Sequence, residues 1–303
     1  VALKPSLGLV SRDYVIPLLD WQDTPGPMGR TVSDVAVLLT GMTGVDNNDP
    51  ATRDATALTG VDFAQFLKPE AAANLRIGVQ VYTDGDVEQM INDTGIKPED
   101  SGELRKALEA ANDEQRQIGH VFSDLGFEVV EVSVAAMPGT PPLDEVLPYG
   151  FRDAINRFLA GLGDQVEVKS LADIIAANAQ DLPNRAPYGQ GYLEEAQASA
   201  QTAEEYQALK KQHQGETHAA LHKLFADYRI DVLITNSQAY APAGLPAITV
   251  PSGYAADGEP IGLLMLADYL GEPKLIAAAY AYEQATHARV EKAIQQIEEL
   301  GKQ

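Results

Sequence analysis

The sequence contains no cysteine, which excludes disulfide bonds, thiolate nucleophiles and cysteine-ligated metals. Because disulfide-free proteins occur on both sides of membranes, this absence leaves the compartment open. Basic residues are also scarce: 22 lysines and arginines stand against 44 aspartates and glutamates, a net charge of −22. Such an excess of acid argues against a nucleic-acid surface and is most simply explained by solubility. Apolar runs such as 263–267 are far too short for a membrane span, so no membrane partner is expected.

What is present indicates an ordinary globular α/β protein. The chain has 303 residues, of which 45% are hydrophobic, enough to bury a large core. A strand at 75–79, an amphipathic helix at 102–125 and an alternating strand at 127–132 predict a β–α–β unit, which is typical of a parallel sheet layer. The region 138–228 is expected to be helical and more polar. The other expected elements are a helix at 32–43, strands at 230–235, 243–253 and 261–267, and a closing helix at 272–299.

A rigid loop precedes the first predicted helix. Pro25 and Pro27 fix the backbone and remove two donors, while Gly26 and Gly29 supply positions without side chains. A surface linker does not need so many backbone constraints beside Trp21, which we expect to lie in the core. The pattern predicts that this loop holds something in place.

Several polar clusters suggest metal or nucleotide sites, and each has a simpler explanation. The acidic turn at 46–50 fits Asx-turn chemistry, and the stretch 83–88 lacks the ordered ligands of a calcium loop. His218 and His222 share a helix face but have no third ligand, so we interpret them as a solvated face. The Gly-Gln-Gly at 189–191 lacks the third glycine of a dinucleotide fingerprint. No metal and no cofactor is predicted.

Four separated blocks carry a more specific signal. They are VALKPSLGLVS (1–11), QDTPGPMGRTVSD (22–34), DVLIT (231–235), and GLPAITVP with IGL (244–251 and 261–263). In this order and spacing they resemble the amidase signature family of hydrolases over nearly the whole chain. The closing helix from 272 is similar to the last helix of that family. The helical middle with residues 188–190 looks most like the peptide amidase branch, which deamidates peptide C-termini.

The resemblance implies an α/β fold with a mixed, mostly parallel central sheet covered by helices on both faces. Residues 1–303 would form the C-terminal portion of one amidase domain, with a sheet and helix core (1–137), a helical substrate-side region (138–228), and returning strands with the closing helix (229–303). The N-terminal part is expected to be absent, since the chain begins at Val1 without an initiator methionine. The isolated chain is then expected to expose apolar sheet edges.

The family cleaves a carboxamide C–N bond with a Ser–cis-Ser–Lys triad. In the resemblance the nucleophile lies just before the block that matches Val1, so all three triad residues are expected upstream and none in this chain. Lys4 and Ser6 match the strand and turn after the nucleophile, and no catalytic role is assigned to them. The chain alone is therefore expected to be inactive.

The resemblance leaves supporting roles for this chain. Gln22, Asp23 and Gly26 are expected to position the nucleophile segment, although a tight packing loop beside a helix start explains them equally well. Tyr188, Tyr192 and Tyr240 could line a substrate pocket, or simply pack. The expected partners are a small amide or peptide-amide substrate and the missing N-terminal portion, as a segment or companion chain. The alternative function is a non-catalytic structural or partner subunit of a larger assembly.

Overall fold

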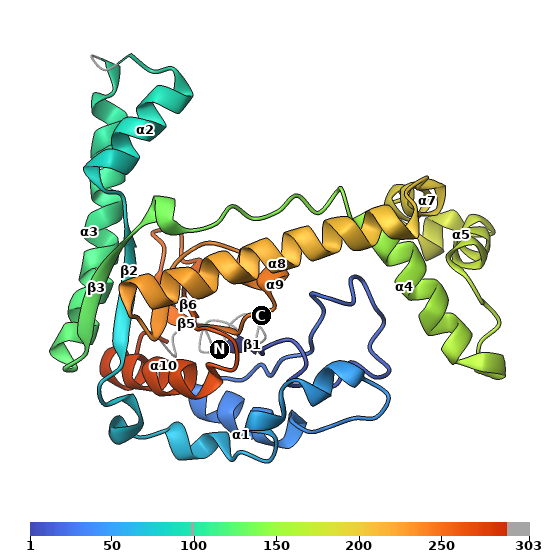
Figure 1. Ribbon diagram of the computed structural model, residues 1–303, viewed down its shortest axis with the longest axis horizontal. Coiled ribbons are helices and arrows are strands. Elements are labelled where there is room, and N and C mark those ends of the chain that lie inside the picture. The colour runs from blue at the N-terminus through green and yellow to red at the C-terminus, as the bar shows by residue number, and fades with distance from the viewer. Residues whose placement is uncertain (98–99, 290–303) are drawn as a thin grey trace, which may run out of the picture.

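The computed structural model describes residues 1–97 and 100–289, and a mixed sheet runs through its centre (Figure 1). The strands lie side by side in the order β1-β5-β6-β4-β2-β3. Their bounds are β1 Ala2–Lys4, β2 Arg76–Val81, β3 Glu128–Ser133, β4 Val232–Ile234, β5 Ala247–Tyr254 and β6 Pro260–Leu266.

Helices cover the sheet and extend beyond it. The α-helices are α1 Val32–Met42, α2 Asp84–Thr94, α3 Gly102–Asp124, α4 Leu147–Gly161, α5 Leu171–Ala179, α6 Leu182–Arg185, α7 Gly191–Ala198, α8 Ala203–Tyr228, α9 Tyr240–Ala243 and α10 Glu272–Thr286. Short 3-10 turns are η1 Pro50–Arg53, η2 Thr56–Leu58, η3 Phe63–Phe66, η4 Pro69–Ala72, η6 Val134–Ala136 and η7 Gly163–Gln165. No helix of the described residues is both long and apolar enough to cross a bilayer.

The predicted α/β fold with a mixed central sheet is confirmed. Parallel pairing joins β2 to β3 and to β4, while β1–β5, β5–β6 and β4–β6 are antiparallel. The sheet is therefore less parallel than expected, because β5 and β6 form a hairpin whose short turn forces them to run in opposite directions. The predicted β–α–β unit is present as β2, α3 and β3.

Alternate residues of the strands face two separate cores. Val232 and Ile234 of β4 join the core beneath α1, α3 and α10, whereas Leu233 points to the core beneath α8 and α9. This period of two is what a strand buried on both faces requires. The helices predicted on both faces of the sheet are thus confirmed.

The helical middle of the chain forms an arm that leaves the sheet along α8 (Figure 1). With 26 residues, α8 is about 39 Å long. A capping box between Thr202 and Glu205 starts it, and α4, α5 and α7 gather beside this end. Ile155 and Leu159 of α4, Leu171 of α5 and Ala196 of α7 form a small separate core between these three helices.

Three elements differ from the sequence expectations. At 83–88, where no element is predicted, α2 begins: the Thr83 side chain accepts Asp86 N–H, and the Asp86 carboxylate accepts Thr83 N–H at 2.7 Å. The strand expected from 243 begins at Ala247, because α9 and Gly244, with φ of 72°, occupy the preceding residues. The closing helix ends at Thr286, and the part expected beyond 289 lies outside the described residues.

Candidate functional site

Strand β1 is hydrogen-bonded along both of its edges near the N-terminus. On one edge it pairs with β5, with Leu3 opposite Ile248. On the other edge Leu3 N–H donates to Pro27 O at 3.1 Å, and Gly29 N–H donates to Val1 O at 3.0 Å. The Val1 ammonium in turn donates to Gly29 O at 3.0 Å. The rigid loop predicted at 22–34 therefore flanks β1 and fixes its position, and this edge is covered rather than exposed.

Gly26 sets how closely this loop approaches the strand. A Cβ atom at this position would lie 2.1 Å from Leu3 O and 3.1 Å from Pro5 Cδ. Because the nearest obstacle is backbone, no side-chain movement would relieve the clash. Close packing thus explains Gly26, and the same packing holds β1 still.

The two polar residues of the loop behave differently. Asp23 Oδ2 accepts the N–H groups of Leu18 at 2.7 Å and Leu19 at 2.9 Å, so its carboxylate stabilises a local turn. Burial raises the pKa of Asp23 despite these two bonds. The buried amide nitrogen of Gln22 has no hydrogen-bond partner among the described residues. The expected supporting role stays a prediction for both residues.

Trp21 ties the loop to the helical arm. Its side chain is fully buried with Leu19, Val146 and Tyr206, the last of which lies on α8. The expectation that this tryptophan lies in the core is confirmed.

The three candidate substrate tyrosines fall into two places. Tyr188 and Tyr192 lie together at the end of the arm, 101% and 86% exposed, where they line a hollow of about 820 Å³. Tyr240 lies on α9 beneath the C-terminal half of α8, where His218 Nδ1 is 3.0 Å from Ala243 O. Its ring centroid is 6.0 Å from Lys4 Nζ. The structure brings the first two tyrosines together and separates them from Tyr240.

Lys4 and Ser6 do not form a nucleophile–base pair. Lys4 Nζ donates to Leu245 O at 2.9 Å and to Pro5 O at 3.1 Å. The Ser6 hydroxyl accepts Leu270 N–H at 2.9 Å, and Ser6 N–H donates to Glu272 Oε1 at 2.6 Å. These contacts fix the turn after β1 and agree with giving the two residues no catalytic role.

The acidic turn at 46–50 is held by its neighbours. Asp49 accepts Arg12 Nε at 2.8 Å and Arg12 N–H at 3.0 Å, and Asp46 accepts the Ser11 hydroxyl at 2.6 Å. The hydrogen bonds from Arg12 hold the pKa of Asp49 below its usual value. Within 1–97 and 100–289, no three acidic or histidine side chains are grouped as a metal ion would require.

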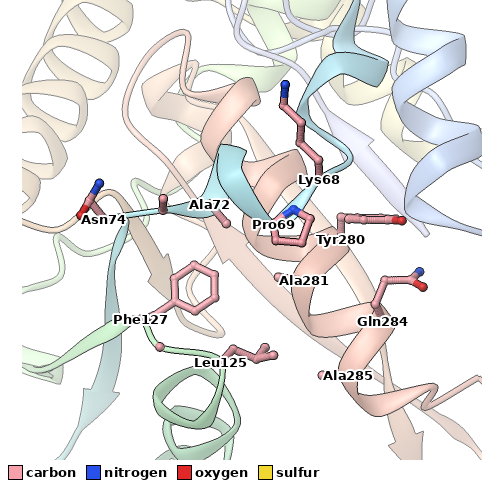
Figure 2. A pocket seen from close by; sticks show the side chains of 12 residues that line it. Lys68, Pro69, Ala72, Asn74, Leu125, Phe127, Tyr280, Ala281, Gln284 and Ala285 are labelled. Carbon is pink, nitrogen blue, oxygen red and sulfur yellow. The ribbon is translucent and has the colours of Figure 1, made fainter.

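A separate apolar cavity of about 510 Å³ opens between α10, η4 and the turn from α3 to β3 (Figure 2). Phe127 and Ala281 line its interior, and Lys68, Asn74 and Gln284 stand around it. It adjoins the β2–β3 end of the sheet, whereas β1 is the strand at the opposite edge. This cavity is therefore not part of the region around β1.

The protein is an α/β protein with one mixed sheet and helices on both faces. Its outermost strand, β1, is covered on its free edge by residues 27–29. The chain belongs to the amidase signature family, since the Amidase family profile matches residues 1–243. This confirms the resemblance drawn from the four sequence blocks.

Individual relatives agree with this assignment. A probable amidase of Arabidopsis thaliana is 30% identical over 95% of this chain and 53% of its own length. The peptide amidase structure from Stenotrophomonas maltophilia is 31% identical with a TM-score of 0.73, over 96% of this chain and 59% of that one, which supports the peptide amidase branch. One of the glutamyl-tRNA(Gln) amidotransferase subunits, from Azoarcus sp., is 26% identical over 94% of this chain and 60% of its own. The chain thus spans about half the length of the curated relatives it matches.

Sequence reasoning missed one buried acid of this region. Glu272 is 0% exposed although it is the first residue of α10, where an acidic side chain usually faces solvent. No local pattern signals such burial, because its partner Ser6 is 266 residues away.

Proposed function

We propose that this chain is the C-terminal portion of an amidase domain that hydrolyses a carboxamide C–N bond with a serine nucleophile. One observation carries the proposal: residues 27–29 and β5 hold β1 from both edges. In the family pattern, the nucleophile segment directly precedes this strand. A strand fixed in this way would hold the nucleophile in a constant position, which efficient acyl transfer requires.

The three parts of the chain take different roles in this proposal. Residues 1–137 and 229–303 supply the sheet and its covering helices, and residues 138–228 supply a substrate-side arm. Gln22, Asp23 and Gly26 support the nucleophile segment without touching the reacting atoms.

The Ser–cis-Ser–Lys triad belongs, in this proposal, to sequence that precedes Val1 in the domain. Two observations support it: Lys4 and Ser6 are engaged elsewhere, and the relatives are about twice as long as this chain. Amide hydrolysis needs an activated hydroxyl and donors aimed at the developing oxyanion. The 303 residues alone would then release no measurable ammonia or amine.

Exposed apolar side chains mark where the preceding segment would pack. Met28 is 77% exposed, Tyr14 72% and Ile16 70%, and Leu18 is exposed as well. All four belong to residues 14–28, which follow β1 and include the segment that flanks it. Large apolar side chains exposed within one stretch are typical of a surface that another segment covers.

The substrate class that fits is a peptide amide. The exposed rings of Tyr188 and Tyr192 beside an open hollow suit an extended chain more than a small enclosed amide. Tyr240 lies nearer β1, beside Lys4, and would contact the part of the substrate close to the scissile bond.

The tyrosines can be tested in the complete domain. Replacing Tyr188 and Tyr192 together by alanine is expected to raise KM for a peptide amide about three- to tenfold, as for the loss of one or two aromatic contacts. The kcat, the KM for a small aryl amide and the unfolding midpoint should stay unchanged, because both rings are exposed. If the variant and the wild type have the same KM for the peptide amide, Tyr188 and Tyr192 do not bind substrate.

An amide-release assay tests the function itself. The 303-residue chain and the same chain joined to its natural upstream sequence would be incubated with peptide amides and aryl amides. We expect ammonia or amine release only from the joined protein. Turnover by the 303 residues alone would contradict the proposed position of the triad, and inactivity of both would contradict the proposed reaction.

A second candidate is a non-catalytic role within a larger assembly, which the similarity to amidotransferase subunits favours. Purification of the joined protein from its source under mild conditions, followed by a native mass measurement, separates the two functions. A stoichiometric second protein together with inactivity of the joined protein on its own would support the assembly role.

A further inference from the structure

Two loops from the last part of the chain contact the turn that follows β1, residues 4–7. From the loop between β6 and α10, Leu270 N–H donates to Ser6 Oγ at 2.9 Å, and the Tyr269 hydroxyl donates to Leu7 O at 2.9 Å. From the loop between α9 and β5, Gly244 O accepts Leu7 N–H at 3.0 Å. The turn is thus tied to segments more than 230 residues away along the chain.

Glu272 lies at the centre of these contacts. It is 0% exposed, and its Oε1 accepts the N–H of Ser6, itself 0% exposed, at 2.6 Å. Its second oxygen, Oε2, has no partner among the described residues. Burial raises the pKa of Glu272, so the protein holds this carboxyl where its charged form is disfavoured.

Lys4 supplies the opposite charge. Its side chain is partly buried, and its ammonium donates to the carbonyls of Leu245 and Pro5 and lies 6.0 Å from the Tyr240 ring. Burial lowers the pKa of Lys4 to about 8, and the charge of Glu272 opposes this shift.

Stability does not explain the burial of these two groups. Both pKa shifts run toward the neutral forms, so burying these two groups costs folding free energy at neutral pH. Glu272 nevertheless links the first residue of α10 to the turn after β1 through Ser6 N–H. A buried acid that costs stability yet joins the first and last parts of the chain points to a role in fixing geometry.

We propose that Glu272 is a positioning residue that fixes the 4–7 turn, and through it β1, against the N-terminus of α10. The catalytic consequence rests on the proposed amidase function, because β1 would carry the nucleophile segment at its start. The fixing of the turn itself is independent of that function.

Two matched double variants of the 303-residue chain, both without the Lys4 charge, test Glu272 by hydrogen exchange. In Lys4→Met with Glu272→Leu, both charges and the acceptor for Ser6 are removed. In Lys4→Met with Glu272→Gln, an amide oxygen still accepts Ser6 N–H. We expect exchange of the peptide spanning 3–10 to be about tenfold faster in the leucine variant, as for the loss of one buried hydrogen bond. The glutamine variant should stay near the wild type.

A control and a variant-free measurement complete the test. Glu283→Gln changes a carboxylate of the same helix that accepts Val32 N–H at 2.9 Å, and it should leave the 3–10 peptide unchanged. The unfolding midpoint of the leucine variant should equal or exceed that of the wild type.

If that variant does not fold, site-resolved exchange in the wild type decides: Ser6 N–H should be among the most protected amides. A Ser6 amide that exchanges like a surface turn, or equal exchange in both double variants, overturns the proposal.

The joined protein supplies the catalytic readout. There the leucine variant should lower kcat about tenfold or more with KM unchanged, and the glutamine variant should restore most of it. An unchanged kcat beside faster exchange overturns the catalytic consequence. If the wild-type joined protein releases no amine, the proposed function fails, while the exchange measurements still decide whether Glu272 fixes the turn.

Discussion

At the scale of single residues, Gly26 controls the distance between the flanking loop and β1. Replacing Gly26 by alanine should lower the free energy of unfolding by about 2–3 kcal/mol, because the new Cβ would lie 2.1 Å from Leu3 O. Urea unfolding measures this. Gly44→Ala is the control, since its Cβ would meet nothing within 4 Å, and should change stability by no more than about 0.5 kcal/mol. Equal effects of the two substitutions would show that the loop can move away from the strand.

The Arg12–Asp49 pair predicts a dependence on pH. Hydrogen bonds from Arg12 lower the pKa of Asp49 in the folded state, so the pair contributes stability above the ordinary value of 3.8 and loses it as the pH falls through the lower folded-state value. Asp49→Asn should therefore cost about 1–3 kcal/mol at pH 7 and progressively less in acid below 3.8. Unfolding curves at several pH values measure the difference, with the exposed Asp124→Asn as control. A cost that does not shrink in acid would rule out the ion pair as its cause.

The residues of the site could be predicted from the sequence only in part. Prolines and glycines at 25–29 indicate a rigid loop through their backbone chemistry alone. What that loop contacts depends on a pairing with Leu3 and Val1, which local chemistry does not encode. The role of Glu272 could not be predicted for the same reason, because its burial follows from contacts with a distant turn.

At the scale of elements, the junction between the loop and the helical arm rests on Trp21. Trp21→Ala should lower the free energy of unfolding by about 3–5 kcal/mol, because it empties a fully buried site between Leu19, Val146 and Tyr206. Thermal unfolding measures the loss. Since the protein has one tryptophan, wild-type fluorescence reports this junction directly and should be blue-shifted and poorly quenched by acrylamide. Emission typical of solvent-exposed tryptophan would contradict the packing.

Strongly patterned elements were predictable and weakly patterned ones were not. The amphipathic α3 and the alternating β3 follow from periodicity, which survives in any context that buries one face. The start of α2 is ambiguous in the sequence, because its first residues, Asp84 to Asp86, favour turns as readily as helix starts. The antiparallel pairing of β4 with β6 is a long-range choice that follows from the assembled sheet.

At the scale of the whole molecule, the acid excess and the apolar surface have separate explanations. The net charge of −22 favours solubility, while Met28, Tyr14 and Ile16 leave apolar side chains exposed in the stretch after β1. The expectation of an exposed sheet edge is wrong where residues 27–29 cover β1. The overall fold was predictable because the four sequence blocks carry the family pattern, whereas the outward reach of the arm along α8 depends on packing that those blocks do not contain.

The most direct test of the proposed division of roles is to locate the reactive serine. A fluorophosphonate, which labels activated serine hydroxyls, would be added to the joined protein and to the 303-residue chain, and the adduct mapped by mass spectrometry. We expect one adduct, on a serine upstream of Val1, and none on the 303-residue chain. An adduct on Ser6, or on any other serine within the 303 residues, would contradict the claim that this chain supports the nucleophile without supplying it.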